Sequence, residues 1–156
     1  MATDNNWTEA TLRYLLVSLL GHSTWEVLQL PLYTIWTTGT AREQIFAVAH
    51  CTAGDVLIAT GCLLAAWLVS GCPRWPRVAF VRVAATAIVL GVIYTAFSEW
   101  LNVAVRGAWA YSSLMPVLHF GNLSIGLSPV MQWIVIPAIS FLVLRYNKRF
   151  SRPMRR

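Results

Sequence analysis

Four apolar stretches dominate the chain, and only a few polar positions interrupt each of them. They cover roughly residues 11–37, 45–71, 78–104 and 127–146. Each is long enough to cross the ~30 Å hydrocarbon core of a bilayer, which takes about 20 helical residues. Pro31 predicts a kink in the first stretch, and Gly71, Cys72 and Pro73 end the second. The pattern predicts an all-α fold, an integral membrane four-helix bundle that forms a single transmembrane domain over residues 1–156.

The connection between the third and fourth stretches, residues 107–128, is the longest loop in this scheme. It contains Trp109, Tyr111 and Pro116, and it is too apolar for a fully solvated loop. We expect it to lie in the membrane interface or to fold back over the bundle as a lid.

Composition supports the membrane assignment, because 57% of the residues are hydrophobic and only 12% are charged. Charged residues make up about a quarter of an ordinary soluble domain. The three cysteines show no CxxC spacing, so no cysteine-based metal site is expected. The four apolar stretches occupy most of the chain, so no separate soluble domain is expected.

The net charge of +6 is distributed unevenly along the chain. If the chain crosses the membrane four times, only Arg42 and Arg106 fall on one side. The other ten basic residues are Arg13, Arg74, Arg77, Arg82, Arg145, Lys148, Arg149, Arg152, Arg155 and Arg156. Because basic residues accumulate on the cytoplasmic side, we expect a bacterial inner-membrane protein with both termini in the cytoplasm. The basic tail fits an anchor for anionic lipids, so nucleic acid is not expected as a partner.

Polar residues inside the apolar stretches recur at intervals of three or four residues, which aligns them on one helix face. The first stretch carries Ser18, His22, Glu26, Gln29 and Tyr33. The third stretch carries Thr95, Glu99, Asn102 and Arg106. The second stretch adds His50 and Asp55, and the fourth adds Gln132 and Trp133.

Three acidic residues, Glu26, Asp55 and Glu99, therefore lie at membrane depth. A charged group at the bilayer centre costs roughly 2.5–3.5 kcal/mol even on lenient insertion scales, so such groups face the bundle interior, pair or stay protonated. We expect them to converge on a polar cavity that opens toward the long loop.

Each of these residues also has a purely structural interpretation. Glu26 and His22 could form a pair one helical turn apart, and Asp55 could be a neutral acid bonded to a carbonyl or hydroxyl group. Glu99 could pair with Arg106 at the interface. The tryptophans and tyrosines would equally suit an interfacial aromatic belt.

The whole constellation suits acid–base catalysis on a lipid, with no cofactor. A carboxylic acid in a low-dielectric cavity can donate a proton near neutral pH, and a second acid or histidine can take one back. The candidate catalytic residues are Glu26, Glu99, Asp55, His50 and His22. Aromatic faces can stabilise a developing carbocation. The candidate substrate-binding residues are Asn102, Trp25, Trp100, Trp109, Tyr111, Tyr33, Gln132 and Trp133.

Isomerisation, cyclisation, hydration or epoxide opening would fit this set of residues. The substrate would be an apolar isoprenoid, sterol or carotenoid-like lipid that enters the cavity from the membrane. Within this interpretation His22 would set the state of Glu26, and Asn102 would orient Glu99 or the substrate.

One partial resemblance points the same way. Glu99-Trp-Leu-Asn102, Arg106-Gly-Ala-Trp109-Ala-Tyr111 and Gly126-Leu-Ser-Pro129 form a spaced pattern. It resembles the membrane-bound carotenoid cyclases, the lycopene cyclase-type domains, in which an acid and Asn at a helix end precede a G-x-W-x-Y loop and a proline-led helix. The paired glutamates that follow this proline in the family are replaced here by Val130, Met131 and Gln132.

A second resemblance involves the first and last stretches. His22-x-x-x-Glu26 and Trp133-Ile-Val-Ile-Pro137 are similar to fragments of the sterol isomerase-like four-helix membrane family. Both resemblances imply proton-transfer chemistry on a lipid held inside a membrane bundle.

Three other functions stay open. A small proton- or cation-coupled transporter, acting as a homo-oligomer, would use the same buried acids. An accessory subunit of a larger membrane complex would explain the aromatic residues but not the acids. The third is a metal site, although we predict no metal. Five residues are competent ligands for zinc or iron: His22, Glu26, His50, Asp55 and Glu99.

Overall fold

The structure is a computed structural model that describes residues 6–72, 74–121 and 123–146. The basic residues that close the chain, Lys148, Arg149, Arg152, Arg155 and Arg156, lie outside the described residues. So does the proline of the predicted breaker at 71–73, whereas Gly71 and Cys72 are described.

Most of the described chain is helical. Its α-helices are α1 (Asn6–Gln29), α2 (Ile35–Thr38), α3 (Ala41–Ser70), α4 (Phe80–Glu99) and α5 (Leu127–Tyr146). A 3-10 turn, η1 (Leu30–Leu32), follows α1, and a π-helical segment, η2 (Trp100–Val105), continues α4. The fold is not wholly α, because β1 (Val117–Phe120) and β2 (Leu123–Gly126) pair as an antiparallel hairpin inside the predicted loop.

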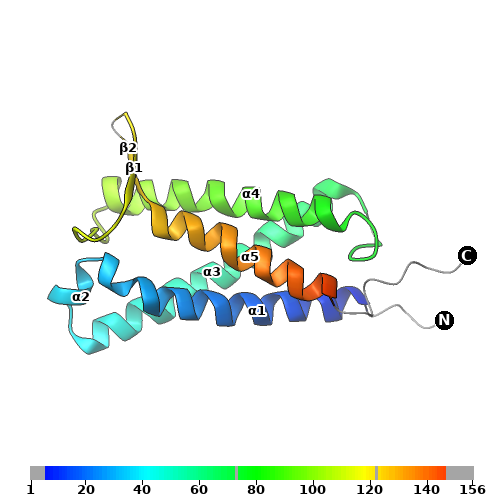
Figure 1. Cartoon of the computed structure of the whole chain (residues 1–156), viewed down its shortest axis with the longest axis horizontal. Helices are drawn as coiled ribbons and strands as arrows, with labels where there is room; N and C mark the ends of the chain where they lie inside the picture. Colours follow the sequence, from blue (N-terminus) through cyan, green and yellow to red (C-terminus); the bar gives the residue numbers. More distant parts are fainter. Residues whose placement is uncertain (1–5, 73, 122, 147–156) are drawn as a thin grey trace, which may run out of the picture.

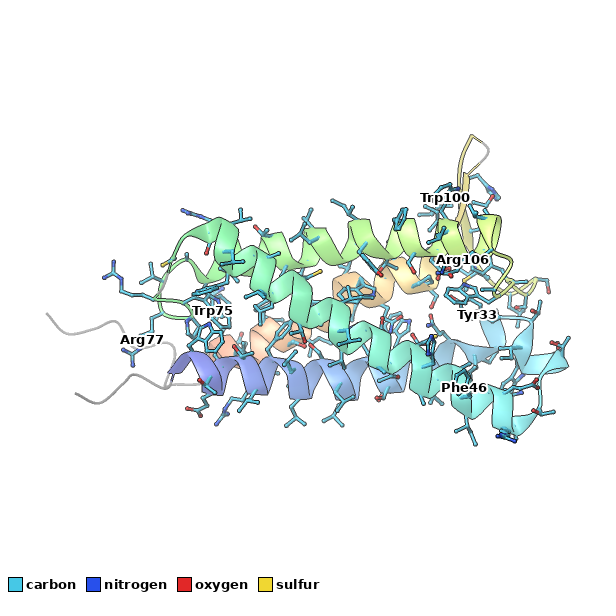
Figure 2. All side chains as sticks on the ribbon, turned by 180° about the vertical axis from the view of Figure 1, so that it is seen from behind. Tyr33, Phe46, Trp75, Arg77, Trp100 and Arg106 are labelled. Atoms are coloured by element: carbon cyan, nitrogen blue, oxygen red, sulfur yellow. The ribbon has the colours of Figure 1, made fainter. Side chains whose placement is uncertain are left out.

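The four long helices pack against one another in a closed arrangement. Helix α1 contacts α3 and α5, and α4 contacts the same two helices. The start of α1, the end of α5 and the 71–79 connection lie at one end, and α2 and the hairpin lie at the other (Figure 1). Figure 2 likewise has Trp75 and Arg77 at the first end and Tyr33 and Arg106 at the second.

Three of the described helices are long and apolar enough to cross a membrane. They are α3, the continuous α4–η2 segment Phe80–Val105, and α5. They match the second, third and fourth predicted spans within a few residues. Helix α1 is not among them, because its polar stripe lowers its mean hydropathy, so a fourth crossing stays a prediction.

The first predicted span ends earlier than expected. Helix α1 stops at Gln29, Pro31 lies in the 3-10 turn η1, and α2 forms a separate short helix. Proline cannot donate the backbone hydrogen bond that would continue α1. The chain therefore breaks here rather than kinking within one helix.

Both ends of helix α3 are defined by capping residues. The Thr40 hydroxyl accepts from the Glu43 backbone N–H, and the Glu43 carboxylate accepts from the Thr40 backbone N–H at 2.7 Å, which completes a capping box. Gly71 ends the helix with φ 58°, a left-handed conformation that glycine adopts without steric cost. Glu43 is thus a capping residue.

Candidate functional site

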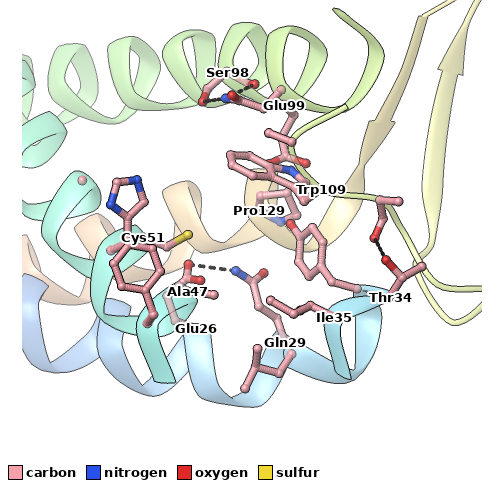
Figure 3. A pocket seen from close by; sticks show the side chains of 18 of the residues that line it. Glu26, Gln29, Thr34, Ile35, Ala47, Cys51, Ser98, Glu99, Trp109 and Pro129 are labelled. Carbon is pink, nitrogen blue, oxygen red and sulfur yellow. Dashed lines mark hydrogen bonds between the residues drawn. The ribbon is translucent and has the colours of Figure 1, made fainter. Parts of the chain in front are cut away.

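A cavity of about 1300 Å³ lies between the helices, at the end that carries α2 and the hairpin. Nine of the thirteen predicted site residues line it: Glu26, Tyr33, His50, Asp55, Glu99, Asn102, Trp109, Gln132 and Trp133. Figure 3 has Glu26 and Glu99 on opposite sides of the cavity, on α1 and at the end of α4. The long loop contributes residues 107–110 to the wall.

One wall is organised around Gln132, near the start of α5. Its side-chain nitrogen lies 3.0 Å from Glu26 Oε1, 3.1 Å from Asp55 Oδ2 and 2.9 Å from His22 Nδ1. An amide nitrogen has two hydrogens, so these three groups cannot all accept from it at once. Three helices thereby converge on one amide.

The predicted structural pair between His22 and Glu26 is not what the structure forms. His22 Nδ1 faces Gln132, and it lies 3.4 Å from Asp55 Oδ2. The imidazole is fully buried and packs on Trp133, with 5.0 Å between the ring centroids. Its Nε2 meets no hydrogen-bond partner among the described residues. His22 therefore supports the acidic cluster from behind and does not line the cavity.

Glu26 is also held from its own helix. Gln29 Nε2 donates to Glu26 Oε1 at 2.8 Å, and Ser128 Oγ donates to Gln29 Oε1 at 2.9 Å. Trp25 Nε1 in turn donates to Ser128 Oγ at 3.1 Å. Trp25 is thus an anchor of this network outside the cavity, rather than part of the substrate-binding wall that the sequence suggested.

The opposite wall is organised around Glu99, at the end of α4. The Tyr111 hydroxyl donates to the Glu99 carboxylate and accepts from the Gly126 backbone N–H at 2.9 Å. Burial, together with the nearby Glu99 carboxylate, raises the pKa of the Tyr111 hydroxyl, which keeps it protonated as the donor. Tyr111 holds Glu99 from behind the wall. The alternative ion pair of Glu99 with Arg106 does not form within the described residues.

The helix that carries Glu99 changes its winding directly after it. In η2 the backbone N–H of Arg106 donates to the Leu101 carbonyl at 2.8 Å, five residues back. Asn102 donates to the Ser98 carbonyl at 2.9 Å and lies 3.2 Å from the Ser98 hydroxyl. Asn102 lines the cavity, but its amide is tied to its own helix rather than to Glu99. Such π-helical turns are rare in proteins as a whole, and those that occur are often found at functional sites.

The loop after η2 folds back onto the segment between α1 and α2, which is one of the two arrangements expected from the sequence. The Thr34 N–H donates to the Ala110 carbonyl at 2.9 Å, and the Ser112 N–H donates to the Leu32 carbonyl at 2.9 Å. The Tyr33 and Tyr111 rings pack at 5.7 Å between centroids. These contacts bring Trp109 beside Glu99 (Figure 3), so the loop covers part of the cavity.

Two predicted residues do not join either acidic wall. His50 lines the cavity, but it is exposed and stacks on Phe46 with 5.6 Å between the ring centroids. Trp100 is 39% exposed and packs on Phe97, away from the cavity. His50 therefore lies on the exposed part of the cavity wall, and Trp100 lies outside the cavity.

Some residues of the site were not recognised in the sequence as site residues. Ser128 connects Trp25 to Gln29, and Cys51 and Ser98 line the cavity. Cysteine and serine at single positions carry no spacing signal that would mark them. In the described part of the chain, no group of three or more His, Cys, Asp or Glu residues is arranged to hold a metal ion.

Comparison with protein-family models, with curated proteins and with solved structures finds no match for this chain. The resemblances to carotenoid cyclases and to the sterol isomerase-like family rest on the quoted residues alone. The geometry of the site therefore carries the functional argument.

Proposed function

We propose that this chain is an integral membrane enzyme that carries out acid–base chemistry on an apolar lipid-like substrate. The observation that carries this proposal is the pair of acidic centres on one cavity: Glu26 and Asp55 around Gln132, and Glu99 on Tyr111. Each carboxyl group is held by protein donors, and the two centres come from different walls. A general acid and a general base require such separate, fixed positions.

Isomerisation of a carbon–carbon double bond illustrates the chemistry. One carboxylic acid gives a proton to one carbon of the substrate, and a carboxylate on the other wall removes a proton from another carbon. The double bond shifts and no net proton is consumed. The rings of Trp109 and Trp133, which line the cavity, would stabilise the cationic intermediate.

The membrane arrangement is part of the proposal. We infer that α1 also crosses, which makes a four-helix membrane bundle. Its outer face supports this, because Leu12, Leu16, Leu20 and Leu28 are each more than half exposed while its polar stripe faces inward. An apolar exposed face is stable against lipid and costly against water.

The proposed orientation rests on the distribution of charge. One half of the bundle contains the 71–79 connection, the start of α1 and the end of α5. Five described arginines belong to this half: Arg13, Arg74, Arg77, Arg82 and Arg145. We propose that this half faces the cytoplasm of a bacterial inner membrane. The cavity would then open toward the opposite side of the membrane.

The enzyme explains the cavity better than a conduit does. Between Gln132 and the end of the bundle that holds the 71–79 connection, the described interior is mostly apolar and includes Ala66, Val83, Phe141 and Leu144. The buried polar groups of this part include Ser18 and Ser140, whose hydroxyl oxygens lie 3.2 Å apart and hydrogen-bond to each other. A cavity confined to one end of the bundle suits a substrate that enters and leaves at that end.

Deuterium incorporation tests the proposal on whatever lipids the native membrane contains. Membranes from a native strain that lacks the gene, complemented with wild-type protein, Glu26→Gln or Glu99→Gln, are incubated in deuterated water. Lipids are then profiled by high-resolution mass spectrometry for deuterium that resists back-exchange. We expect a lipid labelled at carbon with wild-type protein, and a loss of at least about 100-fold with either variant, the typical size of general acid–base effects.

A matched control is Glu9→Gln, an acid that pairs with Arg13 at the opposite end of α1. It should label the same lipid at the wild-type rate. Unchanged labelling in Glu26→Gln and Glu99→Gln membranes would refute the catalytic assignment. Acid-dependent proton flux in sealed vesicles without lipid labelling would favour the transporter, and stoichiometric partner proteins without labelling would favour the accessory subunit.

A further inference from the structure

The mouth of the cavity carries two cationic side chains that the acid–base chemistry does not use. Arg42, in the first turn of α3, and Arg106, directly after η2, both line the cavity. They are the two basic residues that the sequence assigns to this side of the membrane. Both are exposed, and both reach the same cavity from different helices.

Neither guanidinium group has a protein partner within the described residues. The ion pair of Arg13 with Glu9 and the contact of His22 Nδ1 with Asp55 Oδ2 involve neither of these arginines. The two carboxylates nearest in sequence are engaged with other groups, since Glu43 caps α3 through Thr40 and Glu99 accepts from Tyr111. Two cations without an ion-pair partner among the described residues therefore line this cavity, beside Glu43.

The distance from this mouth to the acidic cluster sets the size of a ligand. Arg42 and Asp55 are thirteen residues apart on one helix, which corresponds to about 20 Å along its axis. Half of the hydrocarbon core of a bilayer is about 15 Å thick. A molecule that touches both places must carry a chain as long as that of a membrane lipid.

We propose that the cavity takes a long-chain amphiphile whose anionic head group, a phosphate or carboxylate, is bound by Arg42 and Arg106. Its apolar chain then runs into the cavity toward Glu26 and Asp55. Arginine is suited to this role because its planar donors match phosphate and carboxylate oxygens. This inference rests on the proposed function for the identity of the site, and it specifies the substrate class.

Cys51 provides a built-in reporter of occupancy, because it lines the cavity while Cys62 and Cys72 do not. Purified protein in neutral phosphatidylcholine nanodiscs is treated with N-ethylmaleimide, and alkylation of each cysteine is followed by peptide mass spectrometry. The probes are hexadecyl phosphate, hexadecanol and inorganic phosphate. We expect hexadecyl phosphate to slow alkylation of Cys51 about tenfold at concentrations where hexadecanol and inorganic phosphate do not, since charge-assisted hydrogen bonds are worth that much.

The Arg42→Gln/Arg106→Gln double variant should lose this protection, and the Arg42→Lys/Arg106→Lys variant, which keeps the charges but not the planar donors, should retain only part of it. Arg74→Gln, an exposed arginine of the 71–79 connection, is the matched control and should behave as wild type. An unchanged alkylation rate of buried Cys62 reports that each variant is folded.

Three results would overturn the inference: equal protection by hexadecanol, protection by inorganic phosphate alone, or full protection in the double glutamine variant. The experiment measures binding and not turnover. A negative binding result would therefore not decide the deuterium test of the proposed function. Conversely, protection of Cys51 by hexadecyl phosphate together with no labelled lipid would support the inference while the proposed function fails.

Discussion

At the scale of single residues, the site depends on how one amide is shared. Gln132 is 1% exposed, and its side-chain nitrogen faces Glu26, Asp55 and His22 together. In a low-dielectric interior such hydrogen bonds are strong, and a polar group left without a partner is correspondingly costly. Gln132 thus stabilises the fold and fixes the acids in one place.

Replacement of Gln132 by leucine should destabilise the protein. The change keeps a similar volume but removes the donor shared by two carboxyl groups and a histidine, and each buried group left unpaired costs about 1–3 kcal/mol. We expect a clear drop of the thermal unfolding midpoint in detergent. Met131→Leu, at the neighbouring exposed position, is the control and should leave the midpoint unchanged.

A double-mutant cycle separates this effect from simple loss of packing. Asp55→Leu combined with Gln132→Leu removes a buried acid together with its donor, so the double variant should be more stable than the sum of the single changes indicates. Strict additivity would contradict a shared hydrogen-bonded cluster.

The sequence could indicate which residues are polar and buried, but not how they pair. Helical spacing correctly predicted the inward stripe of His22, Glu26 and Gln29, because the period of a helix is fixed. The partners depend on how α1, α3 and α5 cross, which no local pattern encodes. This is why Gln132 could be selected as a site residue but not as the centre of the cluster.

At the scale of the elements, the position of α5 is set by a close approach to α4. A Cβ atom added at Gly91 would lie 2.2 Å from Cε3 of Trp133. The Trp133 ring in turn packs on His22. Gly91 therefore connects the packing of two helices to the position of the acidic cluster.

Substitution of Gly91 by alanine should displace Trp133 and cost about 1–3 kcal/mol, the usual penalty for an overpacked core. The comparison is Gly61→Ala on α3, where the added Cβ would meet no heavy atom within 4 Å. That change should be neutral or stabilise the helix by up to about 1 kcal/mol. Thermal unfolding of the two variants side by side decides the point, and equal stability would refute the close contact.

Hydropathy predicted the second, third and fourth stretches as membrane-length helices because the bilayer dictates both length and composition. The π-helical turn at Trp100–Val105 could not be predicted, since its residues are those of an ordinary apolar helix. The hairpin was missed although Gly121-Asn122 is a recognised two-residue turn signal. The hairpin was not predicted because the apolar residues of the loop suggested a segment that lies in the membrane interface.

At the scale of the whole molecule, polarity is divided between the two halves of the bundle. The half next to the loop holds the cavity and its acids, and the other half holds a packed apolar core. The proposed crossing of α1 and the proposed orientation give this asymmetry a direction relative to the membrane. A reaction site open to one side only would keep the membrane sealed to protons.

The orientation can be tested with cysteines at the two ends. Two single-cysteine variants are compared. The first, Cys51→Ser/Cys62→Ala, keeps only native Cys72 in the 71–79 connection. The second adds Cys72→Ser and Ser113→Cys, so that its only cysteine lies in the exposed loop at the other end. We expect a membrane-impermeant maleimide to label Ser113→Cys in intact spheroplasts, but Cys72 only after lysis, because basic residues hold their end in the cytoplasm.

The two labelled positions flank the Phe80–Val105 segment, which is long and apolar enough to cross a membrane once. A single crossing places them on opposite sides, so only one of the two should react in intact spheroplasts. Labelling of Cys72 alone would reverse the orientation and place the mouth of the cavity in the cytoplasm. Labelling of both positions would contradict the crossing itself, and with it the membrane bundle on which the proposed lipid substrate depends.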